Sequence, residues 1–432
     1  MLGEGGEGME ATVCLIILAI LCFFFVTELL PLPVTSMGGA VAVGLAGLVP
    51  VKDVTEGFSN VVIVLFGSMY VVGAAMFHTG LAQRLGGMIV RAAGRGENRL
   101  MVGSMAAGAA MSSVLSNTGT TATLLPVVLG ICAASRMSPQ RQLLPLAFGC
   151  GLGGIITIVG TPPNIIASGA LENAGLPGFG FFEFAWIGVP LTLAGILYMA
   201  LIGKRFLPKG DATDEGIDED AAIEAQASVN EPRKMHVTAV ICAAAFLMLV
   251  VGSRIVPMHL TALVAAILLI ATGCLTEKQA VAGVDWLSIF LFAGMMPVAD
   301  ALDTSGAGRL IAEAVVGLMG GSPGPLTVTA TLFAFTCFLT QFMSNTSLTV
   351  LLCPIGISVA GQIGADPRAV LMVIVVAASC AFATPLGTPP NYLVMGPGGY
   401  RFRDYAVAGL PLILVCFLLS LLIIPRVWPL FP

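Results

Sequence analysis

Two short phrases, each present twice, divide this chain into two similar halves. The phrase Ser-Asn-Thr occupies residues 116–118 and recurs at 344–346, an offset of 228. The phrase Gly-Thr-Pro-Pro-Asn occupies 160–164 and recurs at 387–391, an offset of 227. Both place hydroxyls, an amide or helix-breaking prolines inside apolar stretches, where irregular backbone survives only if protein or a water-filled cavity surrounds it. Interrupted segments at matching positions of two halves point to a transporter's binding site. We therefore predict that these four stretches form one site.

The surroundings of these phrases have the composition of an integral membrane protein. Of the 432 residues, 57% are hydrophobic and 10% are charged. A soluble domain would carry about 25% charged residues. The ten cysteines show no CxxC pair and no metal-ligand spacing, so we interpret them as small hydrophobic residues.

The apolar stretches follow the same order in both halves. The predicted first repeat spans 1–203, an acidic linker spans 204–236, and the second repeat spans 237–432. The first repeat contains spans at 12–30, 34–49 and 61–77, an interfacial helix at 81–95, a re-entrant hairpin at 101–135, a broken span at 143–171 and a last span at 181–202. The second contains spans at 237–256, 260–275 and 286–302, an interfacial helix at 309–319, a hairpin at 326–363, a broken span at 369–394 and a last span at 405–424.

The predicted fold class is therefore an all-α polytopic membrane protein with two repeats. Each repeat has five transmembrane helices and one re-entrant hairpin. Because five is an odd number, the second repeat must lie inverted in the membrane relative to the first.

The basic residues predict the orientation. With the linker in the cytoplasm, 14 of the 19 Lys and Arg residues lie on the cytoplasmic side, as the positive-inside rule requires. The five exceptions are Lys52, Arg254, Arg309, Arg368 and Arg426. We thus expect a bacterial inner (plasma) membrane protein with a cytoplasmic linker and both termini external.

The four site stretches contain no charged residue. Half-helix N-termini would present free N–H groups and a positive dipole, which suit carboxylates and other oxyanions. Carbonyl, hydroxyl and amide oxygens suit a hard cation such as Na⁺. The stretches lack the buried carboxylate or histidine relay that proton coupling would need, so we predict sodium as the coupling ion.

The doubled phrases resemble those of the divalent anion/sodium symporter family, which includes sodium-coupled dicarboxylate, citrate and sulfate transporters. The resemblance covers nearly the whole chain and implies a homodimeric elevator, with the first three spans of each half as a fixed scaffold. It implies one sodium ion among Ser112, Ser116, Asn117 and Gly160, and a second among Thr340, Met343, Asn345, Gly387 and Pro389. It implies substrate contacts from Asn117, Thr118, Asn345, Thr346, Thr388 and Pro389. Met343 differs from the small residue expected at its position.

The predicted function is sodium-coupled transport of a small divalent oxyanion, with C4-dicarboxylates such as succinate, malate and fumarate first. Alternatives are a citrate or sulfate carrier, a sodium-independent anion exchanger of the same family, or an arsenite-type carrier of related architecture. A channel would need a continuous polar stripe, and an enzyme would need a nucleophile with a base, paired acids or metal ligands. The acids Glu28 and Asp300 and the histidines His78 and His259 lie near span ends, away from the motifs. We therefore expect a transporter with no organic cofactor, no catalytic residue and no nucleic-acid partner.

Overall fold

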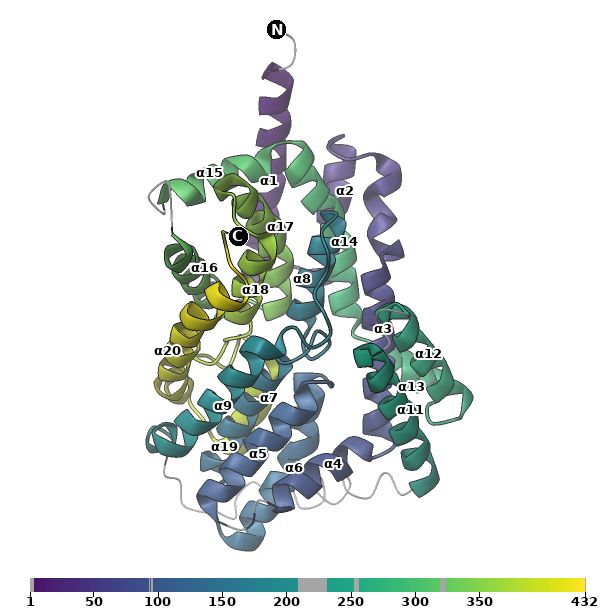
Figure 1. Ribbon diagram of the computed structural model, residues 1–432, viewed down its shortest axis with the longest axis vertical. Helices are drawn as coiled ribbons and strands as arrows, with labels where there is room; N and C mark the ends of the chain where they lie inside the picture. The colour runs from purple at the N-terminus through teal and green to yellow at the C-terminus, as the bar shows by residue number, and fades with distance from the viewer. Residues whose placement is uncertain are drawn as a thin grey trace.

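The computed structural model describes residues 4–92, 94, 96–208, 231–251, 256–318 and 324–431. Within these ranges the ordered elements are helices and the structure contains no β-strand, so the all-α class is confirmed (Figure 1). Most of the predicted linker, residues 209–230, and Arg95 of the predicted interfacial helix lie outside the described residues. The linker's last residues are helical, because α11 begins at Pro232.

The helices of the first half break where the doubled phrases occur. They are α1 (Glu4–Thr27), α2 (Leu32–Leu45), η1 (Val51–Ser59), α3 (Val61–His78), α4 (Leu81–Ala92), α5 (Glu97–Ser112), α6 (Asn117–Ser135), η2 (Pro139–Arg141), α7 (Leu143–Gly154), α8 (Pro162–Asn173), α9 (Ala185–Leu201) and η3 (Gly203–Arg205).

The second half repeats this order of helices. It contains α11 (Pro232–Val251), α12 (Met258–Ala271), α13 (Glu277–Ala282), α14 (Trp286–Thr304), α15 (Ala307–Leu318), α16 (Pro325–Leu339), α17 (Asn345–Ile363), α18 (Pro367–Ala378), α19 (Pro389–Gly398) and α20 (Phe402–Val427). In Figure 1, α4 lies at the lower end of the molecule with α5 and α6, whereas its counterpart α15 lies at the upper end.

Among the described residues, seven helices are long and apolar enough to cross a membrane, and further apolar helices of 10–17 residues accompany them. The shorter helices include the halves of interrupted segments. Two apolar helices in sequence can thus take the place of one full-length span.

The local sequence explains the helix breaks. Ser116 caps α6 by accepting a hydrogen bond from Gly119 N at 3.1 Å, and Ser344 caps α17 by accepting one from Ser347 N at 3.3 Å. A hydroxyl at this position satisfies one of the free N–H groups of the first turn. The helices α8 and α19 each begin with two prolines, which suit a first turn because they have no N–H to satisfy.

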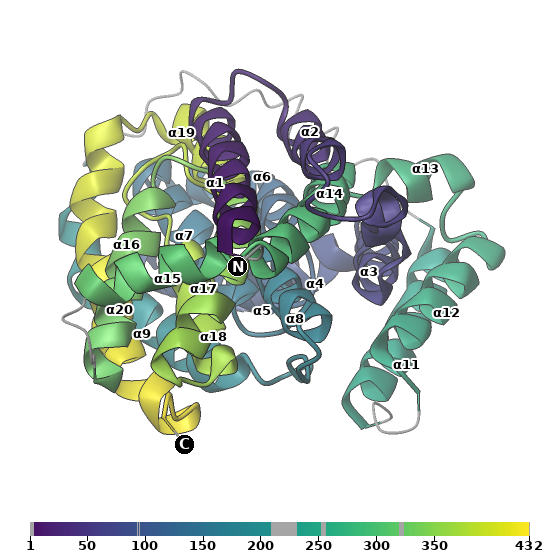
Figure 2. The ribbon, with the colours of Figure 1, turned by 90° about the horizontal axis from the view of Figure 1, so that it is seen from above.

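The two halves interlock around the breaks. The helix that follows Gly-Thr-Pro-Pro-Asn in each half packs against the helix that follows Ser-Asn-Thr in the other, α8 against α17 and α19 against α6. Likewise α2 packs against α14, and α12 against α3. Figure 2 shows α11, α12 and α13 as a group at one edge of the molecule, beside α3. The interrupted elements therefore meet in the interior, with this group at the periphery.

The predicted interfacial helix α4 has two different faces. Ala82, Gly86 and Val90 are buried against the protein, whereas Met88 and Ile89 are exposed beside exposed Arg91. The exposed apolar side chains are available to lipid, which is the arrangement expected of a helix lying along a membrane surface.

Candidate functional site: a cavity between four helix N-termini

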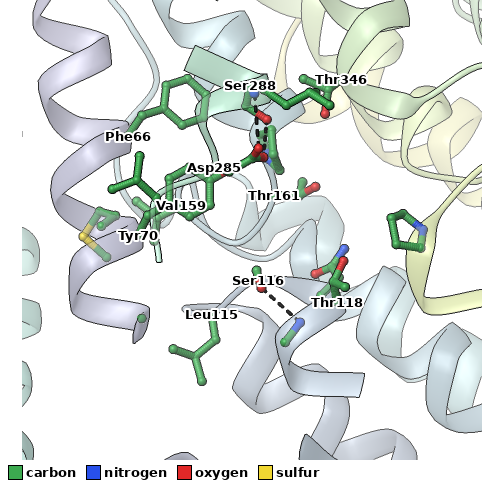
Figure 3. Close-up of a pocket in the computed structure, with 18 of the residues that line it drawn as sticks. Phe66, Tyr70, Leu115, Ser116, Thr118, Val159, Thr161, Asp285, Ser288 and Thr346 are labelled. Carbon is green, nitrogen blue, oxygen red and sulfur yellow. Dashed lines mark hydrogen bonds between the residues drawn. The ribbon is translucent and has the colours of Figure 1, made fainter. Parts of the chain in front are cut away.

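The four doubled stretches line one cavity of about 670 Å³. Its other wall is formed by α3 and by the segment from the end of α13 into α14. The lining residues from the doubled phrases are Ser116, Asn117, Thr118, Gly160, Thr161, Pro162, Ser344, Asn345, Thr346, Gly387, Thr388 and Pro389. Segments more than 200 residues apart thus share one space, in which Figure 3 shows part of the lining.

Four helices begin at this cavity. The residues that precede the first turns of α6, α8, α17 and α19 all belong to the lining: Ser116, Thr161, Ser344 and Thr388. Each helix N-terminus carries the equivalent of about half a positive charge. The first turns of α6 and α17 also offer free backbone N–H groups, whereas α8 and α19 begin with two prolines that have none. This convergence places the four stretches that we predicted to form one site around one cavity. It makes the cavity suited to an oxyanion.

Most of the residues expected to contact substrate and sodium line the cavity, and three of the expected sodium residues are buried outside the lining. All six expected substrate residues line the cavity, as do Ser116, Gly160 and Gly387 of the sodium sets. Of the three outside the lining, Ser112 and Thr340 are fully buried, and Met343 is 2% exposed.

In the first half, two buried side-chain oxygens have no partner among the described residues. Ser112 Oγ and Asn117 Oδ1 are buried, and neither has a hydrogen-bond partner in the described part of the chain. The backbone at Gly160 approaches two carbonyls so closely that a Cβ there would lie 2.9 Å from Ser112 O and 2.5 Å from Gly154 O. Hydroxyl, amide and carbonyl oxygens in a confined space are the donors that a hard cation prefers.

The second half has the same architecture but its polar groups are paired. Thr340 Oγ1 donates its one proton to Ala378 O at 2.6 Å, so the Asn345 atom 2.8 Å from that hydroxyl must be the amide nitrogen rather than the oxygen. In this orientation Asn345 Nδ2 also lies 3.0 Å from Ala378 O and 3.0 Å from Gly387 O. The side chain of Asn345 therefore ties the hairpin to the broken span. Asn117 and Asn345 occupy equivalent positions in the doubled phrase, but their environments differ. The oxygen of Asn117 has no partner among the described residues, whereas the nitrogen of Asn345 faces three acceptors.

The asparagine that ends each Gly-Thr-Pro-Pro-Asn phrase holds the unwound segment in place, a role that the sequence analysis did not assign. Asn164 and Asn391 are buried, and each donates from Nδ2 to the carbonyls ten and seven residues earlier. The acceptors are Gly154 O at 3.1 Å and Thr157 O at 2.7 Å in the first half, and Ala381 O at 2.8 Å and Thr384 O at 2.9 Å in the second. The recurrence of this asparagine in both phrases was the signal available in the sequence.

Two titratable side chains that were not assigned to the site from the sequence also line the cavity. Asp285, the N-cap of α14, accepts hydrogen bonds from Tyr70 OH at 3.2 Å and from Ser288 Oγ at 2.5 Å. Figure 3 shows these three side chains together, away from Ser116 and Thr118. His78, the last residue of α3, belongs to the lining as well, so the expectation that no histidine approaches the motifs is wrong.

The chain also resembles known proteins in sequence and in structure. The model of a family described as "Citrate transporter" matches residues 22–369 and 311–431 of the chain. The chain belongs to the citrate transporter family, of the divalent anion/sodium symporter type. The permease is thus an integral membrane transporter, and its family consists of transporters rather than enzymes.

The permease is similar to both characterised and uncharacterised transporters. It is 25% identical over 421 residues to the sodium-dependent dicarboxylate transporter SdcS of Staphylococcus saprophyticus, covering 89% of this chain and 80% of the relative. It is 23% identical to the uncharacterised transporter YfbS of Escherichia coli, covering 96% and 98% of the two chains.

Solved structures share the fold of the permease. The YdaH transporter of Alcanivorax borkumensis matches with a TM-score of 0.66 at 15% identity, over 97% of both chains. MtrF of Neisseria gonorrhoeae matches with a TM-score of 0.65 at 14% identity, over 96% of this chain and 94% of that one. At such low identity the likeness concerns the fold alone.

Proposed function

We propose that the permease transports small divalent oxyanions, with C4-dicarboxylates such as succinate, malate and fumarate as its substrates, and that sodium drives this transport. The observation that carries the proposal is the convergence of four helix N-termini on one cavity. In the described part of the chain no Lys or Arg lines this cavity. Backbone N–H groups then serve as the anion donors, and a co-bound cation supplies the remaining charge.

The proposed residues follow the depth of the cavity. Substrate carboxylates bind at its surface to Asn117, Thr118, Asn345, Thr346, Thr388 and Pro389. One sodium ion binds behind them at Ser112, Ser116, Asn117 and Gly160, where the unpartnered oxygens support the assignment. The second binds at Thr340, Met343, Asn345, Gly387 and Pro389. The sodium-dependent relative SdcS lends further support to sodium coupling.

We also propose an inverted repeat, re-entrant hairpins and an elevator mechanism in a homodimer. The repeated order of helices and the opposite placement of α4 and α15 in Figure 1 support the inversion. The cavity lies between interrupted helices on one side and α3 with α13–α14 on the other, which is where a moving and a fixed part would meet.

The inversion makes a topological prediction. An epitope inserted in the linker at 209–230 should be cytoplasmic, whereas one fused after Phe431 should be external, because the basic residues concentrate on the linker side. Antibody labelling of intact and permeabilised cells measures both positions. Finding both epitopes on the same side would refute the inverted repeat.

The transport assay uses purified permease in proteoliposomes. Uptake of succinate, malate, fumarate, citrate, sulfate and arsenite is compared with an inward sodium gradient, with equal sodium on both sides, and with potassium in place of sodium. Accumulation of a dicarboxylate only with the sodium gradient is the expected result. Counterflow without sodium would instead identify an exchanger, and uptake of another anion alone would identify one of the alternative carriers.

A substitution at Gly154 tests whether Asn117 acts as proposed. A Cβ at Gly154 would lie 2.5 Å from Asn117 Oδ1, so Gly154→Ala should displace this amide and weaken succinate binding by about tenfold, the effect of losing one hydrogen bond to a charged group. The control is Gly130→Ala in α6, where a Cβ would meet no atom within 4 Å. Equilibrium binding to both variants is the measurement, and equal affinities would contradict the role of Asn117.

A further inference from the structure

The cavity has two walls of opposite electrostatic character. One wall consists of four helix N-termini, which attract an anion. On the other wall, the carboxylate of Asp285 lines the same space. Among the described lining residues, Asp285 is the one Asp or Glu, and no Lys or Arg accompanies it.

The contacts of Asp285 fix its carboxylate in place without neutralising it. Oδ1 accepts from Ser288 N at 3.3 Å, and Oδ2 accepts from Ser288 Oγ and Tyr70 OH. All three donors are neutral groups. Among the described residues, no Lys, Arg or His lies within 4.0 Å of the carboxylate as a salt-bridge partner. A helix cap alone would account for the bond from Ser288 N, but it does not require the carboxylate to face a cavity built for anions.

We propose that Asp285 determines the charge of the substrate that the cavity accepts. Its carboxylate repels every negative charge bound opposite the helix N-termini, so each added substrate charge lowers affinity by a further factor. The cavity then favours dicarboxylates over tricarboxylates such as citrate. This inference rests on the proposed function and narrows its substrate class.

The size of the effect follows from Coulomb's law. For an assumed separation of about 10 Å between the two charges and an effective dielectric constant of about 40, one pair of unit charges changes affinity by about fourfold. Because the interaction energy is proportional to substrate charge, the factor is squared for a dianion and cubed for a trianion. Removing the charge of Asp285 should therefore raise affinity by about 4-fold, 15-fold and 60-fold for one, two and three substrate charges.

The experiment measures binding of a charge series to native permease and to Asp285→Asn. Asparagine keeps the shape of the side chain, and its oxygen still accepts from Ser288 N as an N-cap. The probes are the monoamide of succinate, succinate and citrate, at pH 8 and a fixed saturating sodium concentration, with the neutral diamide as a further control. The matched variant Asp303→Asn removes the same charge from α14, where Asp303 lines a separate cavity of about 310 Å³.

The expected result is a gain for Asp285→Asn that rises with substrate charge and is absent for Asp303→Asn. A role limited to capping α14 would change the affinity of all probes by one common factor, and that outcome would overturn the inference while leaving the proposed function intact. A native permease and an Asp285→Asn variant that both bind none of the anions would overturn the proposed function and this inference with it.

Discussion

Asn117→Ala should weaken succinate binding to the permease by about ten- to a hundredfold, because a hydrogen bond to a charged group contributes about 1.5–3 kcal/mol. Asn117 Oδ1 is buried and has no partner in the described part of the chain, so it does not commit the side chain to the fold. The amide Nδ2 can then donate to a substrate carboxylate, while Oδ1 can only accept and suits a cation. Removal of the side chain should therefore leave the melting temperature close to that of the native permease.

Asn345→Ala should weaken binding to a similar extent and should also lower the melting temperature. Its Nδ2 faces Thr340 Oγ1, Ala378 O and Gly387 O. Removing the side chain leaves Gly387 O and Thr340 Oγ1 without this donor, while Ala378 O keeps the bond from Thr340. Leaving a buried polar group unsatisfied costs about 1–3 kcal/mol. The two asparagines thus differ in a property that their identical motifs do not reveal.

Equilibrium binding and thermal unfolding of the two variants, side by side, separate these effects. The matched control is Asn173→Ala, since Asn173 bonds Asn60 outside the motif cavity. Native affinity in both motif variants would exclude the hairpins from the binding site. Equal loss of stability in both would contradict the different pairing of the two side chains.

Sodium should raise succinate affinity, and potassium or choline should not. Four helix N-termini supply about two positive charges, and Asp285 opposes them with one negative charge, so a dianion is left about half neutralised. A bound cation makes up the difference. Reciprocity then requires that succinate raise the affinity for sodium by the same factor.

Ser112→Ala is the sharpest test of where sodium acts. Ser112 Oγ has no partner in the described part of the chain, so its removal breaks no protein hydrogen bond. We expect the sodium concentration for half-maximal succinate binding to rise by about tenfold, as for the loss of one bond to a charged ligand, while succinate affinity at saturating sodium stays near the native value.

Two comparisons control this experiment. Thr340→Ala should produce the same shift together with lower stability, because its hydroxyl bonds Ala378 O. Ser104→Ala removes another buried hydroxyl from α5, bonded only to Met101 O, and should leave the sodium dependence unchanged. Equal succinate affinity in sodium, potassium and choline would rule out sodium coupling.

The starts of the four helices at the cavity could be predicted from the sequence, because the residues at each start determine where the helix begins. The paired prolines and capping serines start α6, α8, α17 and α19 where the motifs occur. The meeting of these starts could be inferred because each motif is doubled. The opposite wall of the cavity could not be predicted from the sequence. Tyr70 and Asp285 lie outside the repeated polar phrases and approach the motifs only through tertiary packing.

The hydrogen bonds of the Asn345 side chain could not be predicted from the sequence either. They depend on Thr340, whose counterpart in the first half is Ser112, and on the position of the Ala378 carbonyl, which is a matter of the three-dimensional structure. Identical motifs in two halves therefore predict similar backbone, whereas the hydrogen bonds of each copy depend on neighbours that have diverged.

The packing of α8 against α17 and of α6 against α19 has a consequence for biogenesis. As the ribosome releases the first half, α8 and α6 leave the translocon before their partners α17 and α19 have been synthesised. The polar residues that begin α6 and α8 therefore lack their packing partners until nearly 400 residues have been synthesised. Insertion of the individual helices and completion of the cavity are thus separate events in time, and a chain interrupted before Pro389 would be embedded in the membrane without a finished cavity.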